Sequence, residues 1–329
     1  MVAKRPFVRY LVRRLIILAT SFCVAIIALF ILLRIMPGDP SDSLIPIGAT
    51  KEQINAAKHL VGTDQSLPTQ FVHWISNLVS LHFGNSLISG SPVGPEILSR
   101  LRITVPLTLI SFLIAILISV PVGYLSAQKG ATWYGRTLNT ISQFGIAIPV
   151  FWVGLIFIYA FALHWMIFPA GGFPASGWAD FGGSIKSLAL PIATISFVMS
   201  ASLARYVRSA TLDVRNSEYL RTARSLGFSL RQAMLSHGVR NAASPIISIL
   251  GIELATTFVG AVVVETVFAL PGLGSMLVKA IQENDYVAVQ GVLFVSTLIV
   301  MLGGFGADAL QKWIDPRLNR FSNQNGVQS

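Results

Sequence analysis

The sequence contains six long apolar runs, and five of them carry no charged residue. An α-helix needs about 20 mostly apolar residues to cross a hydrocarbon core of about 30 Å. The runs reach or approach that length; they cover 15–33, 103–128, 141–163, 187–204, 245–264 and 286–307. Only 12% of the residues are charged, against about 25% in soluble domains, which excludes a soluble globule. We therefore predict an all-α integral membrane protein with six transmembrane helices.

The first run resembles a secretory signal peptide only in the basic residues that precede it. The stretch from Leu15 to Leu33 has 19 residues, more than the roughly 7–15 of a signal-peptide core. The sequence Met36-Pro-Gly-Asp-Pro40 that follows has no small-residue cleavage site, and its two prolines cannot continue a helix. We expect a retained membrane helix that ends in a turn at Pro37 to Pro40.

The excess of basic residues predicts topology. Lys and Arg outnumber Asp and Glu by 24 to 14, which alone could indicate nucleic-acid binding. With six spans, however, both tails and the two loops after the second and fourth spans lie on one side, and they hold 17 of the 24 basic residues. The positive-inside rule makes this side cytoplasmic, with both termini inside. We expect no nucleic-acid partner.

The spans divide the chain into four parts. Residues 1–36 form a basic tail and the first helix, and residues 37–102 form an extracytoplasmic region. Residues 103–308 form the transmembrane core, which includes a cytoplasmic loop at about 205–243, and residues 309–329 form a cytoplasmic tail. In the extracytoplasmic part, Thr50 and Gln53 predict a capping box for a helix over 51–61. Apolar residues at helical spacing predict a second helix over 70–81, which either lies on the membrane surface or, as we favour, packs on the outer mouth.

The loop between the fourth and fifth spans is patterned as two short helices. Ser217 can cap a helix whose face carries Tyr219, Leu220, Ala223 and Leu226, and Gly227 can end it in a left-handed conformation. Ser229 and Gln232 form a capping box for a second helix, for which Gly238 is the expected stop. The basic charge fits contact with anionic lipid headgroups, and the apolar face fits docking to a cytoplasmic partner.

This loop carries a family resemblance. The segment from Ala223 to Gly227, followed by His237-Gly-Val-Arg-Asn241, resembles the EAA loop of bacterial ABC importer permeases. Further motifs make the chain similar to the B-type permease of the oligopeptide and dipeptide transporter family over roughly residues 8–318. These are Arg34-Ile-Met-Pro-Gly-Asp-Pro40, Phe83-Gly-Asn-Ser86, Glu265-Thr-Val-Phe-Ala-Leu-Pro-Gly-Leu-Gly274 and Asp315-Pro-Arg317.

The resemblance implies the type I ABC importer permease fold, with a first helix wrapping around a five-helix core, in the bacterial plasma (inner) membrane. The partners it implies are a second related permease, two ATP-binding subunits and an extracytoplasmic substrate-binding protein. ATP binding on the ATPases would drive alternating access through a coupling helix. The positions carried over as ATPase contacts are Arg221, Thr222, Ala223, Gly227 and His237, although Glu and Ala are typical of the family where Arg221 and Thr222 stand.

The chain itself shows no signature of catalysis. It contains no G-x-x-x-x-G-K-[ST] loop, so we expect ATP and Mg²⁺ to bind on partner subunits and no cofactor on this chain. No G-x-S-x-G or H-E-x-x-H pattern indicates a hydrolase, and the five scattered histidines and the single Cys23 predict no metal site. We expect no catalytic residues.

Two acids of the fifth span are candidate functional residues. Glu253 falls near mid-membrane, where a carboxylate can meet the amino group of a peptide or another cation, or can be hydrated or paired with a neighbouring helix. Glu265, with Pro271, Gly272 and Gly274, is expected to shape the outer turn after the span.

Three classes of function follow. The leading class is a permease subunit of an ATP-driven importer for peptides or related small solutes. The alternative is a self-contained secondary transporter or channel, for which a docking loop would be incidental. A structural scaffold is disfavoured because an intramembrane acid such as Glu253 costs stability unless it serves a pathway. The sequence does not name the substrate.

Overall fold

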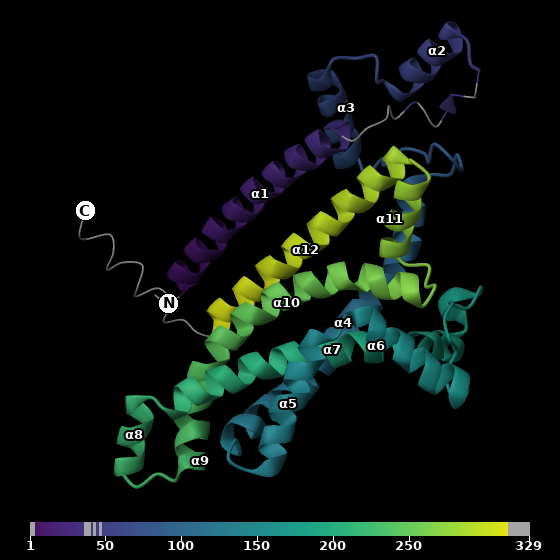
Figure 1. Ribbon diagram of the computed structural model, residues 1–329. Helices are drawn as coiled ribbons and strands as arrows, with labels where there is room; N and C mark the ends of the chain where they lie inside the picture. Colours follow the sequence, from purple (N-terminus) through teal and green to yellow (C-terminus); the bar gives the residue numbers. More distant parts are fainter. Residues whose placement is uncertain (1–3, 36–40, 42–43, 46–47, 315–329) are drawn as a thin grey trace.

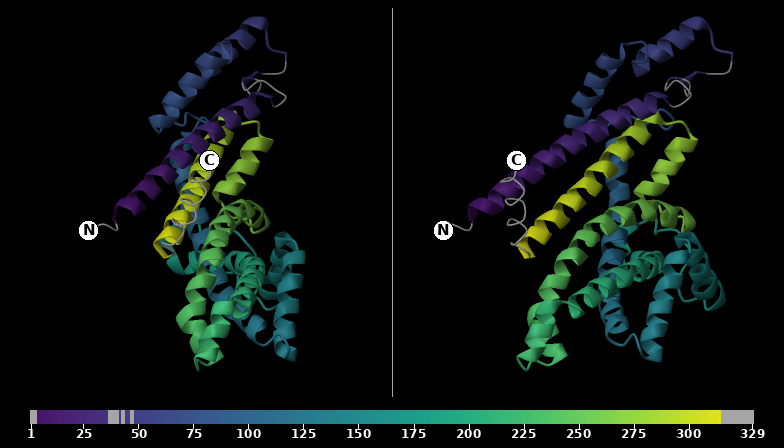
Figure 2. Two further views of the ribbon diagram at one scale, coloured as in Figure 1. Left: turned by 90° about the vertical axis from the view of Figure 1, so that its left-hand side faces the viewer. Right: turned by 60° about the vertical axis from the view of Figure 1, so that its left-hand side comes forward.

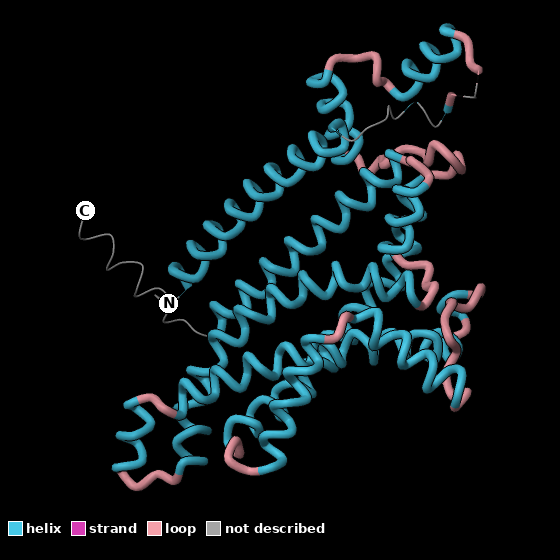
Figure 3. Tube along the Cα trace, in the orientation of Figure 1, coloured by secondary structure: helices cyan, strands magenta, loops and turns pink. Residues whose placement is uncertain are grey.

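The computed structural model describes residues 4–35, 41, 44–45 and 48–314. This part of the chain consists of helices joined by turns and loops, with an isolated antiparallel bridge between Asn85 and Pro92 (Figures 1 and 3). The elements in chain order are α1 (Lys4–Ile35), α2 (Lys51–Val61), α3 (Leu67–Val79), α4 (Val93–Gln128), α5 (Trp133–Ala147), α6 (Val150–Phe157), η2 (Ile158–His164), η3 (Gly177–Ala179), α7 (Phe181–Arg215), α8 (Glu218–Ser225), α9 (Leu230–Ala233), η4 (Met234–Gly238), α10 (Val239–Val267), α11 (Leu273–Gln282) and α12 (Tyr286–Ile314).

Five of the described helices are long and apolar enough to cross a membrane, and a sixth span arises if one bent pair is counted as a unit. The five lie in α1, α4, α7, α10 and α12, in agreement with the predicted runs. The helices are longer than the charge-free runs. For example, α7 continues to Arg215 and α10 begins at Val239, so the predicted 205–243 loop shortens to the segment between them.

The predicted third span, 141–163, is not one helix. The chain turns by 104° between α5 and the continuous pair of α6 and η2. Pro149 lacks an N–H and pushes the residue before it out of the helical region, and Ile148 accordingly has φ −86° and ψ 124°. Pro149 therefore breaks the span, and the bent pair wraps around α7.

The pair α4 and α7 forms the centre of the molecule, and α7 is the most buried of the spans. The two helices approach closely at Gly123, where a Cβ atom would lie 2.6 Å from the carbonyl oxygen of Ala204. Only a glycine permits this contact, as is common between membrane helices. The core cluster around Leu107, Leu188 and Phe268 continues this packing toward α10.

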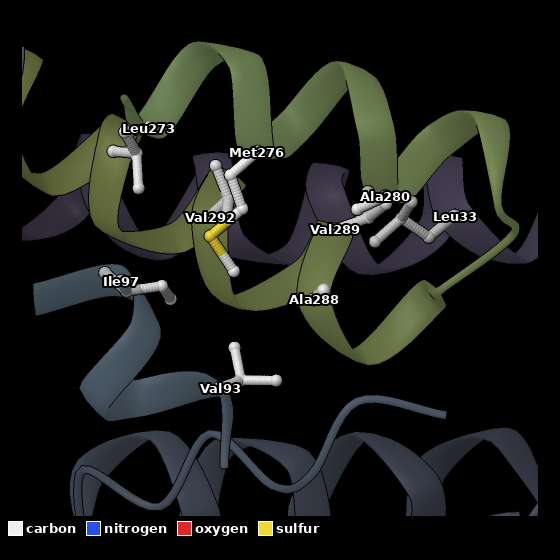
Figure 4. Close-up of a cluster of buried hydrophobic side chains, with 9 residues drawn as sticks. All are labelled: Leu33, Val93, Ile97, Leu273, Met276, Ala280, Ala288, Val289 and Val292. Carbon is white, nitrogen blue, oxygen red and sulfur yellow. The ribbon is translucent and has the colours of Figure 1, made fainter. Parts of the chain in front are cut away.

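The first helix lies at the periphery along α12 (Figures 1 and 2). Phe22 stacks near Phe294 with ring centroids 5.5 Å apart, and Arg14 pairs with Asp308 at 3.0 Å. At the other end of α1, Leu33 joins a buried cluster with residues of α4, α11 and α12 (Figure 4). The outer end of α1 is thereby anchored to the core.

Both helices predicted within residues 37–102 are present. The capping box of Thr50 and Gln53 begins α2, and α3 starts at Leu67, three residues earlier than predicted. Phe71 and Trp74 of α3 pack against Phe30 of α1, with ring centroids 5.1 and 5.6 Å apart, so α3 packs on the protein as expected. The turn at Pro37 to Pro40 and the sequence Asp315-Pro-Arg317 lie outside the described residues.

The ends of the helices sort into two sides. The start of α1, the end of α12 and the pair α8 and α9 lie toward one end of the molecule, and α2, α3 and α11 lie toward the other (Figures 1 and 2). The start of α1, the end of α12 and the hairpin of α8 and α9 therefore lie toward the same end of the described structure.

Candidate functional site

The hairpin formed by α8 and α9 projects from one end of the molecule (Figure 1). Gly227 joins its two helices with φ +94°, a left-handed conformation that side chains other than glycine rarely adopt. The capping box of Ser229 and Gln232 is present, but the Ser217 hydroxyl does not cap α8, because it donates to the Val214 carbonyl at 2.6 Å. The hairpin thus has a defined shape.

The apolar face of α8 corrects an expectation. Leu220 and Ala223 are buried within the chain itself, where they join Val214, Ala233 and Met234 in one cluster. This face of α8 packs against the end of α7 and the start of α10, since Val214 of α7 and Ala242 of α10 belong to the same cluster. Ala223 therefore leaves the set of surface residues expected to contact an ATPase.

Other apolar residues remain at the tip of the hairpin. Leu226 is 75% exposed and Phe228 is 43% exposed, on either side of Gly227. Arg221 and Thr222 are also exposed, on α8. The tip therefore combines exposed apolar side chains with basic and polar ones, which is typical of a surface that a partner covers.

The predicted stop at Gly238 is wrong. The chain passes from α9 through the π-helical segment η4 into α10 without a break, and Gly238 has the helical angles φ −79° and ψ −47°. A Cβ at Gly238 would lie 3.1 Å from both Val214 and Met234, so this glycine serves close packing. The backbone of His237 lies in η4, and its side chain is outside the described part of the structure.

Glu253 lies at the midpoint of the 29-residue helix α10. Its carboxylate accepts a hydrogen bond from the Ser202 hydroxyl at 2.8 Å and lies 3.4 Å from the Thr256 hydroxyl. These three residues line a cavity of about 280 Å³, together with Ile146 and Val150 on either side of the α5–α6 bend. The cavity has no Lys, Arg or His in its wall, and within the described residues Glu253 forms no ion pair.

Glu265 lies near the C-terminal end of α10 and is fully buried. Its carboxylate accepts hydrogen bonds from the Thr104 hydroxyl at 2.6 Å and from the backbone N–H groups of Gly274 and Ser275 at 2.8 and 3.1 Å. The two N–H groups belong to the first turn of α11, so Glu265 caps that helix from a distance. The sequence analysis expected only a turn here, and α11 is an additional helix.

The glycines of this turn make room for the carboxylate. A Cβ at Gly272 would lie 2.1–2.3 Å from the three carboxyl atoms of Glu265. A Cβ at Gly274 would lie 2.5 Å from the Val262 backbone. Pro271, half-buried, precedes them. The structure therefore brings Glu265, Gly272 and Gly274 into one structural unit.

Asp285 forms a second capping site that the sequence analysis missed. Its carboxylate accepts from the N–H of Ala288 at 3.2 Å in the first turn of α12, and from the hydroxyl of Ser86 and the N–H of Leu87. Ser86, the last residue of the Phe83-Gly-Asn-Ser86 sequence after α3, is thereby bound to the start of α12. An Asp directly before an apolar run is a helix-start signal that could have revealed it.

Within the described ranges, no group of three or more His, Cys, Asp or Glu side chains is arranged to hold a metal ion. The described residues thus form an exposed apolar and basic tip at one end, a cavity with one acid that has no ion-pair partner in the middle, and buried acid-capped helices at the other end.

Comparison with known proteins identifies the family. A family model described as the binding-protein-dependent transport system inner membrane component matches residues 119–320, and a model of the N-terminal part of such components matches residues 7–108. The chain belongs to this family. It is a multi-pass permease of an ABC transporter, in a family of membrane components that are not themselves the catalytic subunits.

Named relatives match almost the whole chain. It is 33% identical over 311 residues to the probable peptide ABC transporter permease protein y4tP of Sinorhizobium fredii, covering 94% of this chain and 98% of that protein. The oligopeptide transport system permease AppB of Bacillus subtilis is 33% identical and the glutathione transport system permease GsiC of Escherichia coli K12 is 32% identical, each with the same coverage.

Solved structures show the fold. The MetNI methionine ABC transporter in an inward-facing conformation superposes with a TM-score of 0.52 at 18% identity, over 67% of this chain and 96% of the other. This likeness assigns the ABC importer permease fold.

Proposed function

We propose that the chain forms half of the translocation pathway of an ATP-driven importer for peptides or related small solutes. The relatives named for peptide, oligopeptide and glutathione transport support the substrate class. In this proposal a second related permease supplies the other half, and an extracytoplasmic binding protein delivers the substrate. The bent pair counts as the third of six spans, and both termini face the cytoplasm, as the basic residues indicate.

The exposed tip of the α8–α9 hairpin is the observation that carries the proposal. Two ATP-binding subunits hold ATP and Mg²⁺, and one of them covers the tip around Leu226, Gly227 and Phe228, with Arg221 and Thr222 beside it. The buried face of the same hairpin packs on α7 and α10. A pull on the tip is therefore transmitted to the two helices that border the Glu253 cavity, which opens to one side of the membrane and then to the other.

Glu253 is the proposed substrate contact in this pathway. Its charge has no cationic partner in the cavity wall, so an ammonium group of a passing peptide can pair with it. The Ser202 hydroxyl holds one carboxylate oxygen and leaves the other near Thr256 at the cavity.

The test of the docking proposal is co-purification of the chain with its ATPase after substitution at the tip. We expect Gly227→Asp and Leu226→Glu each to abolish the association, because the first strains the turn and the second puts a charge in the contact. The matched controls are Gly62→Asp, at a glycine of φ +76° that also ends a helix in open space, and Leu67→Glu, at a leucine 57% exposed on the outer side.

Association that survives both tip variants would contradict the docking site. A chain that transports without any ATPase in liposomes would refute the importer subunit and favour a self-contained transporter.

A further inference from the structure

The bend between α5 and α6 leaves an apolar groove beside α7. The groove has a volume of about 530 Å³ and is lined by residues of α4, α5, α6 and α7, among them Ile118, Leu138, Ile141, Phe157, Ala193 and Phe197. It lies on the face of α7 that includes Ala193, Phe197 and Ala201, and it is separate from the cavity at Glu253. A straight third span would not produce this hollow.

No polar group in the groove requires a polar occupant. Its only hydroxyls belong to Ser142, Ser196 and Ser200. Each of them donates to a backbone carbonyl, at 3.0, 3.1 and 2.9 Å. A hollow of this size with apolar walls does not hold water well, and an empty one loses dispersion contacts. An apolar chain is therefore the occupant that fits.

Basic residues mark one end of the groove. Arg205 and Arg208 follow Ala201 on α7 by four and seven residues, so they lie about 6 and 10 Å farther along the same helix face, toward the hairpin end. Lys129 ends α4 nearby, since an Arg208 nitrogen comes within 3.8 Å of the place that a Cβ on the adjacent Gly130 would take. The groove is thus apolar along its length and has three basic side chains at one end.

These cations have no acidic partner in the described part of the chain. The ion pairs found there involve neither Arg205 nor Arg208 nor Lys129. The Nε of Arg208 is buried without a hydrogen-bond partner, and the guanidinium carbon of Arg205 lies 5.1 Å from the centre of the Tyr206 ring. Arg215 differs, because it donates to the carbonyls of Ala127 and Gln128 at the end of α4.

We propose that this groove binds an anionic phospholipid of the leaflet on the hairpin side. One acyl chain fills the apolar groove, and the phosphate lies between Arg205, Arg208 and Lys129. A phospholipid has an apolar chain and an anionic group in the order and spacing that the groove requires. Basic pockets between membrane helices on the cytoplasmic side bind anionic headgroups in this way. A partner helix in the same groove would need its own acids at that depth.

Photo-labelling tests the proposal. The full chain, alone and assembled with its partner subunits, is placed in nanodiscs that contain phosphatidylglycerol with a diazirine in one acyl chain, and the labelled peptides are mapped by mass spectrometry. We expect labels on the α5 and α7 segments that contain Leu138, Ile141 and Phe197. The double variant Arg205→Gln/Arg208→Gln is expected to lower this labelling about tenfold or more.

The matched control is Arg136→Gln. Arg136 lies on α5 at the same membrane surface, but it is two residues before Leu138 and so about 200° around the helix from the groove face. We expect its loss to leave labelling unchanged. A second variant, Ala193→Phe, fills the groove without changing charge, and it is expected to reduce labelling by every phospholipid probe; if it does not fold, the arginine variants decide.

Three outcomes would overturn the proposal. Equal labelling by a phosphatidylcholine probe would remove the role of the cations. Labels absent from the groove in both samples would exclude a bound acyl chain. Labels present in the chain alone but lost on assembly would show that the second permease covers the groove.

Discussion

Helix α10 carries two glutamates twelve residues apart, and they differ in burial and in the backbone groups that bind them. Glu265 is fully buried, and its carboxylate accepts three hydrogen bonds from Thr104 and from the first turn of α11. Glu253 is half-buried at the wall of a cavity, and only hydroxyls approach its carboxylate.

The comparison separates a structural acid from one that is available to a ligand. A charge within a membrane protein is expensive, and it persists where it is paired or where it faces a pathway. Glu265 fulfils the first condition through the N-terminal end of α11. In the proposed function Glu253 fulfils the second, because it faces a cavity and no cation in the described residues pairs with it. The same residue type on one helix can therefore serve the fold at one position and transport at the other.

The largest expected effect is on Glu265. Replacement by Ala leaves the Thr104 hydroxyl and two N–H groups of α11 without their acceptor in a buried site, which should destabilise the protein by about 3 kcal/mol. The measurement is thermal unfolding of the purified chain in detergent. Glu253→Ala is the matched control on the same helix, and an equal loss of stability at both positions would break the comparison.

The substitution Gly272→Ala should be nearly as damaging. The new Cβ would enter the space of the Glu265 carboxyl group and force it away from α11, at a cost of about 2 kcal/mol. In a chain that already carries Glu265→Ala the same change should cost little, because the clash is gone. Additive losses in this double-mutant cycle would show that the two residues act independently.

Glu253→Gln tests the other acid, and it should lower transport instead of stability. It keeps the shape and hydrogen bonding of the side chain but removes the charge, so stability should be unchanged. Uptake of substrates with a free amino group should fall about tenfold, which corresponds to one charge-assisted hydrogen bond. The check is uptake of matched peptides with free and acetylated amino ends, and identical uptake of every substrate by the variant and the wild type would remove Glu253 from the pathway.

The smallest effect is expected at Ser202. Its hydroxyl orients the Glu253 carboxylate at 2.8 Å, and Ser202→Ala should lower the same uptake about threefold. In the Glu253→Gln background the further loss should be smaller, since the charge that Ser202 orients is absent. Ser200→Ala is the control that should have no effect. Ser200 lies two residues before Ser202, about 200° around α7, and its hydroxyl donates to the Phe197 carbonyl of the same helix.

The spans and the helix signals near them could be predicted from the sequence because they depend on local properties. The apolar runs found α1, α4, α7, α10 and α12, and the capping boxes found the starts of α2 and α9. Errors arose where a local signal had two meanings. Pro149 lies in an apolar run and breaks it, whereas Pro121 lies within α4, which continues past it.

The residues that bind the two acids could not be predicted from local sequence signals. Thr104 lies 161 residues from Glu265, and Ser202 lies 51 residues from Glu253. Nothing in their own neighbourhoods marks them, since isolated Thr and Ser residues are common in membrane helices. Only the folded arrangement of α4, α7 and α10 brings each hydroxyl to its carboxylate.

The sequence by itself determined that this chain crosses a membrane and where its five long apolar helices lie, because apolar length acts on each segment separately. The tertiary structure decided which surfaces remain open. It buried Leu220 and Ala223 inside the hairpin, exposed Leu226 at its tip, and bent the third span around α7. Burial depends on which helices lie side by side, and that is a property of the whole fold.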